Sequence, residues 1–400
     1  MKKNPLANMF FIGAYNAPPE KKLTQKRVND ISNAGIDVII TGGSKKNILT
    51  LMKFADKTGL KVIPMNSSWI AAMQKSTNQN ATAKIQKIIA DYSNQSSLLA
   101  YGIYDEPAAD LFPKLNISSK EFQKYDSIHP PLINLLPSYG SPVQLGASDF
   151  RAYISLFIKN VNPVVLSYDY YPFREGTTLF DGWHNDLRIV REESRKANIP
   201  FWVFVQSEGI KGGLKVPSRE EIFWQANTAL TYGARGILWF CYWTPPYFPK
   251  SRMHEKHYSA MIDIKGNKTP LYNYITEENN FLKAAGGNLA DWDNKYIARY
   301  KNGKLIGGNS PVGTPKGKNF NLIIGTFTKN NNIRLVFSND SFTKENTFSF
   351  LPEKQFQFVK VIKNFHSEFQ KNNNFKLKPG GCIIIEFSTS SSNKKQGNKK

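Results

Sequence analysis

The 400-residue sequence contains few cysteines and no long apolar segment. Its two cysteines, Cys241 and Cys382, each lie within an apolar run, which excludes a disulfide framework and a four-cysteine zinc site. The longest apolar stretches, such as Val38–Thr41 and Gly236–Trp243, are far shorter than the roughly 18–20 residues that cross a bilayer. We therefore predict no membrane span and expect both cysteines to be buried.

We also recognise no export signal in the sequence. Met1-Lys2-Lys3 is basic, but the following residues, Asn4–Ala7, are too few and too polar to form the apolar region of a signal peptide. We expect a cytoplasmic location, or a secreted or periplasmic one where a leader has already been removed. The sequence carries no indication of oligomeric state.

Acidic residues are scarce relative to basic ones. The chain has 53 Lys and Arg against 31 Asp and Glu, a formal net charge of +22. Such a charge attracts anions, whether nucleic acid, an acidic or sulfated glycan, or anionic lipid. No RNP, KH, zinc-finger or basic-zipper pattern is present, and the lysines are scattered among Asn and Ser. We expect no nucleic-acid partner; a plain bias toward Lys and Asn is the alternative explanation of the charge.

Residues 9–245 repeat one unit: a short apolar run, a turn rich in Gly, Pro, Asn or Ser, and a longer stretch with helical spacing. This alternation is typical of βα units around a parallel sheet whose strands are covered on both faces. The eight predicted strands are Met9–Tyr15, Val38–Gly42, Lys61–Met65, Leu98–Tyr104, Leu132–Leu136, Val164–Tyr168, Phe201–Val205 and Gly236–Tyr242. The sequence therefore predicts an α/β fold, a (β/α)8 TIM barrel over residues 1–288, closed by a helix around Pro270–Ala285.

The pattern changes after the barrel. From about residue 320 apolar residues alternate with polar ones between Asn-rich turns, which is typical of antiparallel strands. We predict a linker over 289–318, a small antiparallel, sandwich-like β domain over 319–388, and a disordered tail over 389–400 because that segment is rich in Ser, Asn and Lys.

Polar and aromatic residues gather where the predicted barrel strands end. In such barrels the side chains that do chemistry project from the carboxyl ends of the strands. The candidates near these ends are Asn16, Asn66, Trp69, Asp105, Glu106, Tyr139, Asp169, Tyr170, Tyr171, Gln206, Glu208, Trp239 and Trp243. The aromatic members suit the apolar faces of sugar rings, while the amides and carboxylates suit sugar hydroxyls.

Two of these candidates, Glu106 and Glu208, form the pair that glycosidic bond cleavage needs. One carboxyl group protonates the leaving oxygen while the other attacks the sugar carbon. A gap of roughly 5–5.5 Å between them permits a covalent intermediate, whereas about 6.5–9.5 Å admits water and inverts the configuration. For the pair to act, Glu106 has to be protonated while Glu208 is ionised, so their environments must separate the two pKa values.

The motifs around these glutamates resemble clan A of the glycoside hydrolases. Glu106 lies in Tyr-Gly-Ile-Tyr-Asp-Glu-Pro after the fourth strand, and Glu208 in Phe-Val-Gln-Ser-Glu-Gly after the seventh. The resemblance covers roughly residues 9–285 and implies a retaining barrel enzyme with Glu106 as acid/base and Glu208 as nucleophile, assisted by Tyr168 or Tyr170. The sequence departs from the clan at Asp105, where members carry Asn to bind the sugar 2-hydroxyl.

Each candidate also has a structural interpretation. Asp-Glu-Pro is a common start of a helix, with Pro in the first turn. Glu208 stands before a Lys- and Gly-rich loop, where a carboxylate is often merely solvated. Asp169 is a rival for the second carboxylate, and otherwise binds substrate or pairs with Arg174. Trp239 alternates with inward-facing residues and so also fits the core. The pair His254 and His257 lacks a carboxylate at a spacing that suits a metal, so we expect no metal and no cofactor.

The sequence thus predicts a hydrolase that cleaves β-linked oligo- or polysaccharides by a retaining mechanism. A basic cleft favours an anionic glycan. The loops Ala108–Ser127 and Phe173–Gly182 are long enough to wall such a cleft. Two alternatives remain: a barrel that binds carbohydrate without cleaving it, and a glycosidase that uses Asp169 in place of Glu208.

Overall fold

The computed structural model describes residues 6–66, 69, 78–246, 257–370 and 373–389. The chain divides into two compact units. The first consists of Met1–Pro217 and Gly236–Asn279, and the second of Ser218–Arg235 and Asn280–Lys400. The second unit thus includes a segment from inside the predicted barrel region, in addition to the predicted C-terminal domain.

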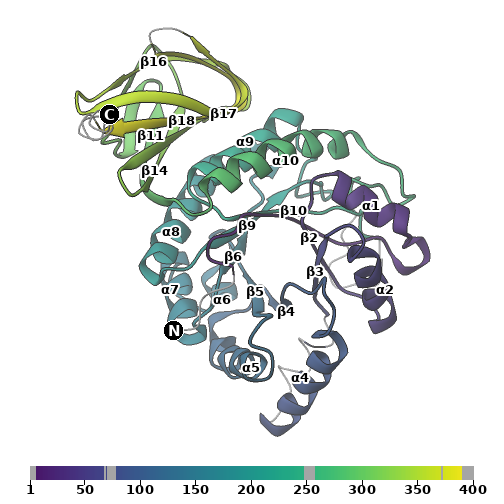
Figure 1. Cartoon of the computed structure of the whole chain (residues 1–400). Coiled ribbons are helices and arrows are strands. Elements are labelled where there is room, and N and C mark those ends of the chain that lie inside the picture. The colour runs from purple at the N-terminus through teal and green to yellow at the C-terminus, as the bar shows by residue number, and fades with distance from the viewer. Residues whose placement is uncertain (1–5, 67–68, 70–77, 247–256, 371–372, 390–400) are drawn as a thin grey trace, which may run out of the picture. The chain divides into compact units, whose positions relative to one another are not determined.

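Eight parallel strands form a barrel in the first unit (Figure 1). They are β1 (Phe11–Tyr15), β2 (Val38–Thr41), β3 (Lys61–Pro64), β4 (Tyr101–Asp105), β5 (Pro131–Leu135), β6 (Leu166–Asp169), β9 (Phe201–Gln206) and β10 (Gly236–Phe240). Their order is β3-β2-β1-β10-β9-β6-β5-β4. Parallel bridges from Val62 to Leu98 and from Met65 to Gly102 join the two ends of this order. The predicted (β/α)8 barrel is confirmed.

The barrel interior is filled by apolar side chains, so it is a packed core. Members of this core are Phe11, Val38, Ile40, Ile63, Ala100, Leu132, Trp202, Phe204 and Leu238. Gly102 is required at the closing seam, because a Cβ there would lie 2.8 Å from the Cβ of Met65. Burial on both faces explains why these strands read as unbroken apolar runs.

Helices surround the strands of this unit (Figure 1). The structure has η1 (Glu20–Lys22), α1 (Gln25–Asn33), α2 (Lys45–Ala55), α4 (Asn78–Tyr92), η2 (Ala109–Leu111), α5 (Phe112–Tyr125), α6 (Pro142–Leu145), α7 (Phe150–Val161), α8 (Phe180–Ala197) and α10 (Pro270–Leu289), the last of which continues into the second unit. Local signals set their ends. Thr24, Ser44 and Asp149 each accept a backbone N–H in the first turn of α1, α2 and α7, and such caps satisfy donors that have no partner within the helix.

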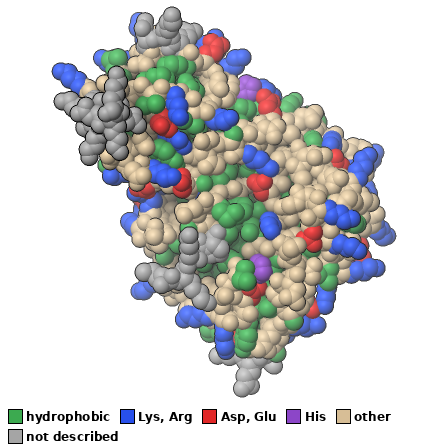
Figure 2. Space-filling model, in the orientation of Figure 1, with side chains coloured by type: hydrophobic (Ala, Val, Ile, Leu, Met, Phe, Trp, Pro, Cys, Tyr) green, Lys and Arg blue, Asp and Glu red, His purple; other side chains and the backbone are tan. Residues whose placement is uncertain are grey.

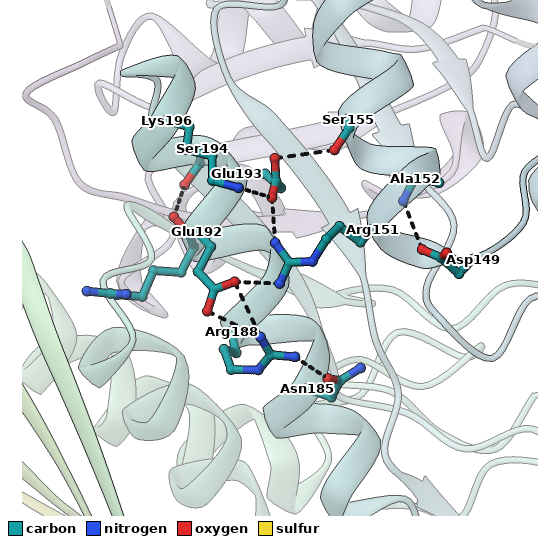
Figure 3. Close-up of polar contacts among 11 residues, drawn as sticks. Asp149, Arg151, Ala152, Ser155, Asn185, Arg188, Glu192, Glu193, Ser194 and Lys196 are labelled. Atoms are coloured by element: carbon teal, nitrogen blue, oxygen red, sulfur yellow. Dashed lines mark hydrogen bonds and ion pairs between the residues drawn. The ribbon is translucent and has the colours of Figure 1, made fainter. Parts of the chain in front are cut away.

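An ion-pair network joins α7 to α8 on the outside of the barrel (Figure 3). Arg151 of α7 pairs with Glu192 and, at 2.5 Å, with Glu193 of α8. Arg188 and Lys196 extend the network along α8, at 3.2 Å from Glu192 and 2.8 Å from Glu193. Glu193 is 9 % exposed, whereas Arg188 is 50 % exposed, so the inner part of this network is the better shielded from solvent.

The segment Ala108–Ser127 is mostly a helix, so the prediction that it is a long loop is wrong. Phe112, Leu115 and Phe122 lie on the buried side of α5 at helical spacing, and Pro113 stands in its first turn, where the missing N–H is tolerated. The other predicted loop, Phe173–Gly182, contains the short antiparallel strands β7 (Phe173–Arg174) and β8 (Thr177–Thr178).

The second unit is built on one antiparallel sheet and the helix α9 (Arg219–Thr231). Its strands are β11 (Asp293–Lys301), β12 (Lys304–Gly308), β13 (Gly313–Lys316), β14 (Leu322–Lys329), β15 (Asn332–Asn339), β16 (Asn346–Pro352), β17 (Phe356–Gln370) and β18 (Asn374–Thr389). Seven of them run in the order β12-β11-β14-β15-β18-β16-β13, and β17 pairs with β18. Every pairing in this sheet is antiparallel, as predicted for the C-terminal region.

Polar side chains fasten α9 to this sheet. The hydroxyls of Thr231 and Ser338 are 2.6 Å apart, and the amide of Asn227 donates to the carbonyl of Gly380 at 2.9 Å. The indole of Trp224 donates to Asp340 at 3.2 Å. The helix is buried from Glu221 to Thr231. The side chains of Trp224, Asn227 and Thr231 can be buried there because they form the hydrogen bonds above.

The predicted linker 289–318 instead carries three strands, β11, β12 and β13. Its charged residues conceal the alternation: in β11, Ala298 and Tyr300 are buried while Lys301 is exposed. Residues 390–400 of the predicted disordered tail lie outside the described residues.

Among the described residues, no helix combines the length and the apolar composition needed to span a membrane. Lys and Arg side chains are spread over the face of the molecule seen in Figure 2, among acidic and uncharged side chains.

Candidate active site

Three carboxylic acids meet at the carboxyl ends of β4 and β6. Asp105 is the last residue of β4, Glu106 follows it, and Asp169 is the last residue of β6. A side-chain hydrogen bond joins Asp169 to Glu106, and a second joins Asp169 to Tyr171. Burial, followed by the negative charges of Glu106 and Asp105, raises the pKa of Asp169 well above its usual range. Asp169 therefore keeps its proton more readily than a free carboxyl group does.

Asp105 belongs to the same group. Its side chain keeps access to solvent at the barrel mouth, although protein atoms surround it. The resulting loss of hydration, together with the charge of Glu106, raises the pKa of Asp105 to about 7. The amide of Asn134 on β5 opposes this rise by donating to Asp105 Oδ1 at 3.3 Å. Asp105 stands at the sequence position where the clan A resemblance predicts Asn.

The backbone at Glu106 is strained. Glu106 has a φ of 50°, in the left-handed region that residues other than glycine rarely adopt. Its N–H donates to the carbonyl of Asn134 at 2.9 Å, and the carbonyl of Pro107 accepts the Tyr153 hydroxyl at 2.6 Å. The next helical turn begins only after Ala108, so Asp-Glu-Pro does not cap a helix. These bonds fix Glu106 at a sharp exit from the strand.

Aromatic rings line the carboxyl group cluster. Tyr139, after β5, is 42 % exposed and lies with its ring centroid 5.1 Å from that of Tyr170. The backbone N–H of Tyr171 hydrogen-bonds to the Tyr139 side chain, whose pKa is raised by burial and then by the charge of Asp169. The guanidinium of Arg174 lies 4.6 Å from the Tyr139 ring centroid.

A second group of aromatic rings consists of Tyr15, Tyr171 and Phe240, with Phe240 in contact with both of the others. Phe240 at the end of β10 stacks with Tyr15 at 5.8 Å and contacts Tyr171 at 5.2 Å. Burial, followed by the charge of Asp105, raises the pKa of Tyr15 to about 12. Tyr15 therefore remains a neutral hydroxyl near this carboxyl group.

Glu208 lies in the loop after β9 and is 0 % exposed. Its Oε1 is 2.7 Å from Nδ1 of His257, and its Oε2 accepts a hydrogen bond from the Cys241 thiol at 3.1 Å. Burial and the charge of Glu208 raise the pKa of Cys241 well above its usual range, which keeps the thiol a donor. The interpretation of Glu208 as a solvated loop residue is wrong, because both of its oxygens are held inside the protein.

The side chains of four other candidates contact protein groups around the mouth of the barrel. The amide of Asn16 donates to the carbonyl of Trp243 at 2.7 Å, and that of Asn66 to the carbonyl of Gly43 at 2.9 Å. Gln206 is fully buried and bonds to backbone groups of the loops that follow β6 and β9. Trp69 packs on Tyr92 of α4 at 5.6 Å.

The two candidate tryptophans near the end of β10 are buried. Trp239 is 0 % exposed, and its indole donates to Asn279 of α10 at 2.9 Å. Trp243 is 2 % exposed and lies 5.5 Å from the Arg27 guanidinium of α1. The Tyr170 hydroxyl is directed at Gly182 of α8, where a Cβ would lie 2.0 Å from it.

Sequence reasoning missed two participants. His257 was considered only for a metal, although its contact is with Glu208, and Arg174 was expected to pair with Asp169, although it lies on Tyr139. Neither contact has a sequence signal, because each joins loops that follow different strands. Among the described residues, no group of three or more His, Cys, Asp or Glu is placed to hold a metal; His254 lies outside the described residues.

Comparisons with known proteins identify the fold. No family model and no curated protein matches the sequence. A solved structure described as a glycoside hydrolase matches with a TM-score of 0.58 and 13 % identity, over 96 % of this chain and 93 % of its own. A family 30, subfamily 8 xylanase from Clostridium acetobutylicum matches with a TM-score of 0.50 and 13 % identity, over 95 % and 96 % of the two chains.

The β-galactosidase of the psychrophilic Marinomonas ef1 matches with a TM-score of 0.54 and 9 % identity. The match covers 70 % of this chain and 61 % of that enzyme, so the chain spans less than two thirds of the enzyme's length. At these identities the likeness establishes the fold, a TIM-like barrel followed by an antiparallel sheet.

Proposed function

We propose that this protein is a glycoside hydrolase that cleaves β-linked oligo- or polysaccharides at the mouth of its barrel. The observation that carries the proposal is the hydrogen-bonded pair of Glu106 and Asp169 at the ends of β4 and β6. Proteins seldom place carboxyl groups this close unless one proton is shared between them. The fold of the solved glycoside hydrolases supports the same function.

In this proposal Glu106 is the general acid. A glycosidic oxygen leaves only when it is protonated, so the acid must still hold its proton near neutral pH. Burial and the charge of Glu106 raise the pKa values of Asp169 and Asp105, so in this proposal the carboxyl groups around Glu106 keep a proton near neutral pH that Glu106 passes to the leaving oxygen. Tyr139 offers the exposed ring on which a sugar face stacks.

The second carboxylate is assigned to Glu208, as nucleophile of a retaining reaction. His257 and Cys241 hold its two oxygens, which fixes its orientation, and a fixed nucleophile reacts faster than a mobile one. The covalent glycosyl-enzyme would then be released by water, with Glu106 acting as base. Asp169 is the rival, since it lies 5 % exposed beside Glu106.

Activity of three variants tests these assignments. Glu106→Gln, Asp169→Asn and Glu208→Gln are assayed on aryl β-glycosides and a glycan panel, with Glu121→Gln on α5 as the matched control and circular dichroism to verify folding. We expect Glu106→Gln to lose about 10²–10⁴-fold in kcat on substrates with poor leaving groups. Full activity of that variant would contradict the proposal.

The configuration of the first product separates the two second carboxylates. Proton NMR of a fresh reaction should show the β-anomer, because two displacements retain the configuration. An α-anomer, with Asp169→Asn inactive and Glu208→Gln active, would assign the second role to Asp169. Affinity for a glycan without any turnover by the native protein would instead identify a carbohydrate-binding barrel.

A further inference from the structure

Arg174 on β7 is a cation at the candidate site without a protein anion to neutralise it. Its guanidinium carbon lies 4.6 Å from the ring centroid of Tyr139. Among the described residues its side chain has no ion pair or hydrogen bond, and its Nε is buried without a partner. A buried N–H that lacks an acceptor costs free energy in the folded protein, so an arrangement of this kind points to an acceptor supplied from outside.

The cation belongs to the same site as the carboxyl groups. The Tyr139 side chain experiences the charges of Asp169, Arg174 and Glu106 together, so all three lie close enough to act on one side chain. Asp169 nevertheless bonds to Glu106 and Tyr171, and Arg174 stays on the face of Tyr139. The guanidinium therefore lies near the proposed reacting carboxyl groups and forms no ion pair with them.

The backbone of Arg174 is held rigidly. The preceding residue, Phe173, is bonded by Gln206 at both its N–H and its carbonyl, each at 3.0 Å. Arg174 itself pairs with Thr177 across the β7–β8 hairpin and forms a bridge with Leu214. Gln206 projects from the end of β9, so the barrel sheet fixes the position of this cation, and a fixed donor loses less entropy on binding.

We propose that Arg174 binds an anionic substituent of the sugar, a carboxylate or a sulfate ester, and so selects an acidic glycan as substrate. This inference rests on the proposed function. A guanidinium presents a planar fork of donors that matches both oxyanions, and its Nε supplies a donor that is already stripped of water. The contact with Tyr139, 4.6 Å from the ring centroid, keeps the guanidinium beside the exposed ring on which the sugar is proposed to stack.

The test compares matched neutral and acidic substrates. The probes are 4-nitrophenyl β-glucoside, β-glucuronide and 6-sulfo-β-glucoside, and the corresponding galactosides. For each pair, kcat/KM is measured by release of nitrophenol, and the affinity is measured by isothermal titration calorimetry. The proteins are the native chain, Arg174→Gln, Arg174→Lys, and Arg188→Gln as a control that removes one positive charge on the outside of α8.

We expect the native protein to prefer acidic members, and the ratio of acidic to neutral kcat/KM to fall about 10- to 150-fold in Arg174→Gln, the range for a hydrogen bond to a charged group. Arg174→Lys should fall between the two, because it keeps the charge but loses the fork. Arg188→Gln should keep the native ratio. Preference for the glucuronide over the sulfo-glucoside, or the reverse, identifies the substituent.

Two results would overturn the inference: an unchanged ratio in Arg174→Gln, or a native protein that neither cleaves nor binds any acidic member. Hydrolysis of neutral glycosides alone would overturn it while leaving the proposed function in place. Binding of acidic members that is lost in Arg174→Gln, without hydrolysis of any probe, would support Arg174 as the anion site and contradict the proposed hydrolase.

Discussion

Replacing the buried carboxyl group of Asp186 with an amide should change how the stability of the protein depends on pH. Asp186 lies on α8, is 0 % exposed, and accepts the backbone N–H of Ser138 at 2.8 Å. Burial raises its pKa from 3.8 to about 7, although the Ser138 bond opposes the rise. Ser138 immediately precedes Tyr139, so this buried acid lies beneath the loop that carries the candidate sugar-stacking ring.

The sign follows from the two pKa values. Below about pH 4 Asp186 is protonated in both the folded and the unfolded chain. Between about pH 4 and 7 the unfolded chain releases the proton while the folded chain keeps it, so stability falls as the pH rises. Above about pH 7 the full penalty is present. A rise from 3.8 to about 7 corresponds to about 4 kcal/mol, because a tenfold change in proton affinity equals about 1.4 kcal/mol.

Asp186→Asn removes this penalty but keeps an oxygen for the Ser138 N–H. We expect the free energy of unfolding of the variant, relative to the native protein, to increase by up to about 3 kcal/mol between pH 4.5 and pH 8, because about 1 kcal/mol of the penalty is already present at pH 4.5. Urea denaturation followed by tryptophan fluorescence at four pH values measures it, with Asp110→Asn at an exposed position as the control. Burying the amide changes the free energy of unfolding by the same amount at every pH. The test therefore depends on how the difference between variant and native protein changes with pH. Parallel profiles for variant and native protein would refute the reasoning.

Two further substitutions test the packing around the barrel. Gly182→Ala should destabilise the protein by about 1–3 kcal/mol, since its Cβ would lie 2.0 Å from the Tyr170 hydroxyl oxygen; thermal unfolding should show partial recovery when Tyr170→Phe is added, and an additive double variant would contradict the clash. Arg151→Ala should cost about 1–2 kcal/mol in urea denaturation, because it leaves the nearly buried Glu193 with fewer donors. Arg188→Ala should cost about 0.3–0.5 kcal/mol, and equal losses for the two arginines would show that burial of the partner does not matter here.

The barrel could be predicted because its strands are buried on both faces. Runs such as Val38–Thr41 and Phe201–Gln206 leave no polar alternation to confuse with surface strands. The segments that were missed have the opposite character. In α5 the buried face includes Ser118 and Ser119 as well as Phe112, and in β11 charged residues interrupt the alternation. Neither pattern separates these segments from a polar loop without the surrounding structure.

The sequence predicted which residues lie at the carboxyl ends of the strands, because the barrel topology determines this. It did not predict which of their side chains point into the site. Asp105, Glu106 and Asp169 follow neighbouring parts of one parallel sheet, and the carboxyl ends of its strands meet at one edge. The direction of a side chain is not set by its place in the chain alone. Trp239 and Gln206 stand at strand ends just as Asp169 does, but the first bonds to a helix and the second to loop backbone.

Three energetically unfavourable features coincide at this edge of the barrel. Glu106 has a left-handed backbone, Asp169 is a buried acid beside another carboxyl group, and the Nε of Arg174 lacks an acceptor. Strain of the first kind costs about 1–3 kcal/mol, and a buried polar group without a partner costs a similar amount. Elsewhere in the first unit some buried polar groups are compensated, as Asn134 is by Ser167 and Asp126 by Tyr101 and His129. Others, such as Asp186 Oδ1 and Trp202 Nε1, are buried without a hydrogen-bond partner among the described residues. The mouth differs in that a strained backbone, a buried acid beside another carboxyl group and a donor without an acceptor occur together there. In the two proposals made above, the acidic pair and the uncompensated cation are parts of one site for a charged sugar.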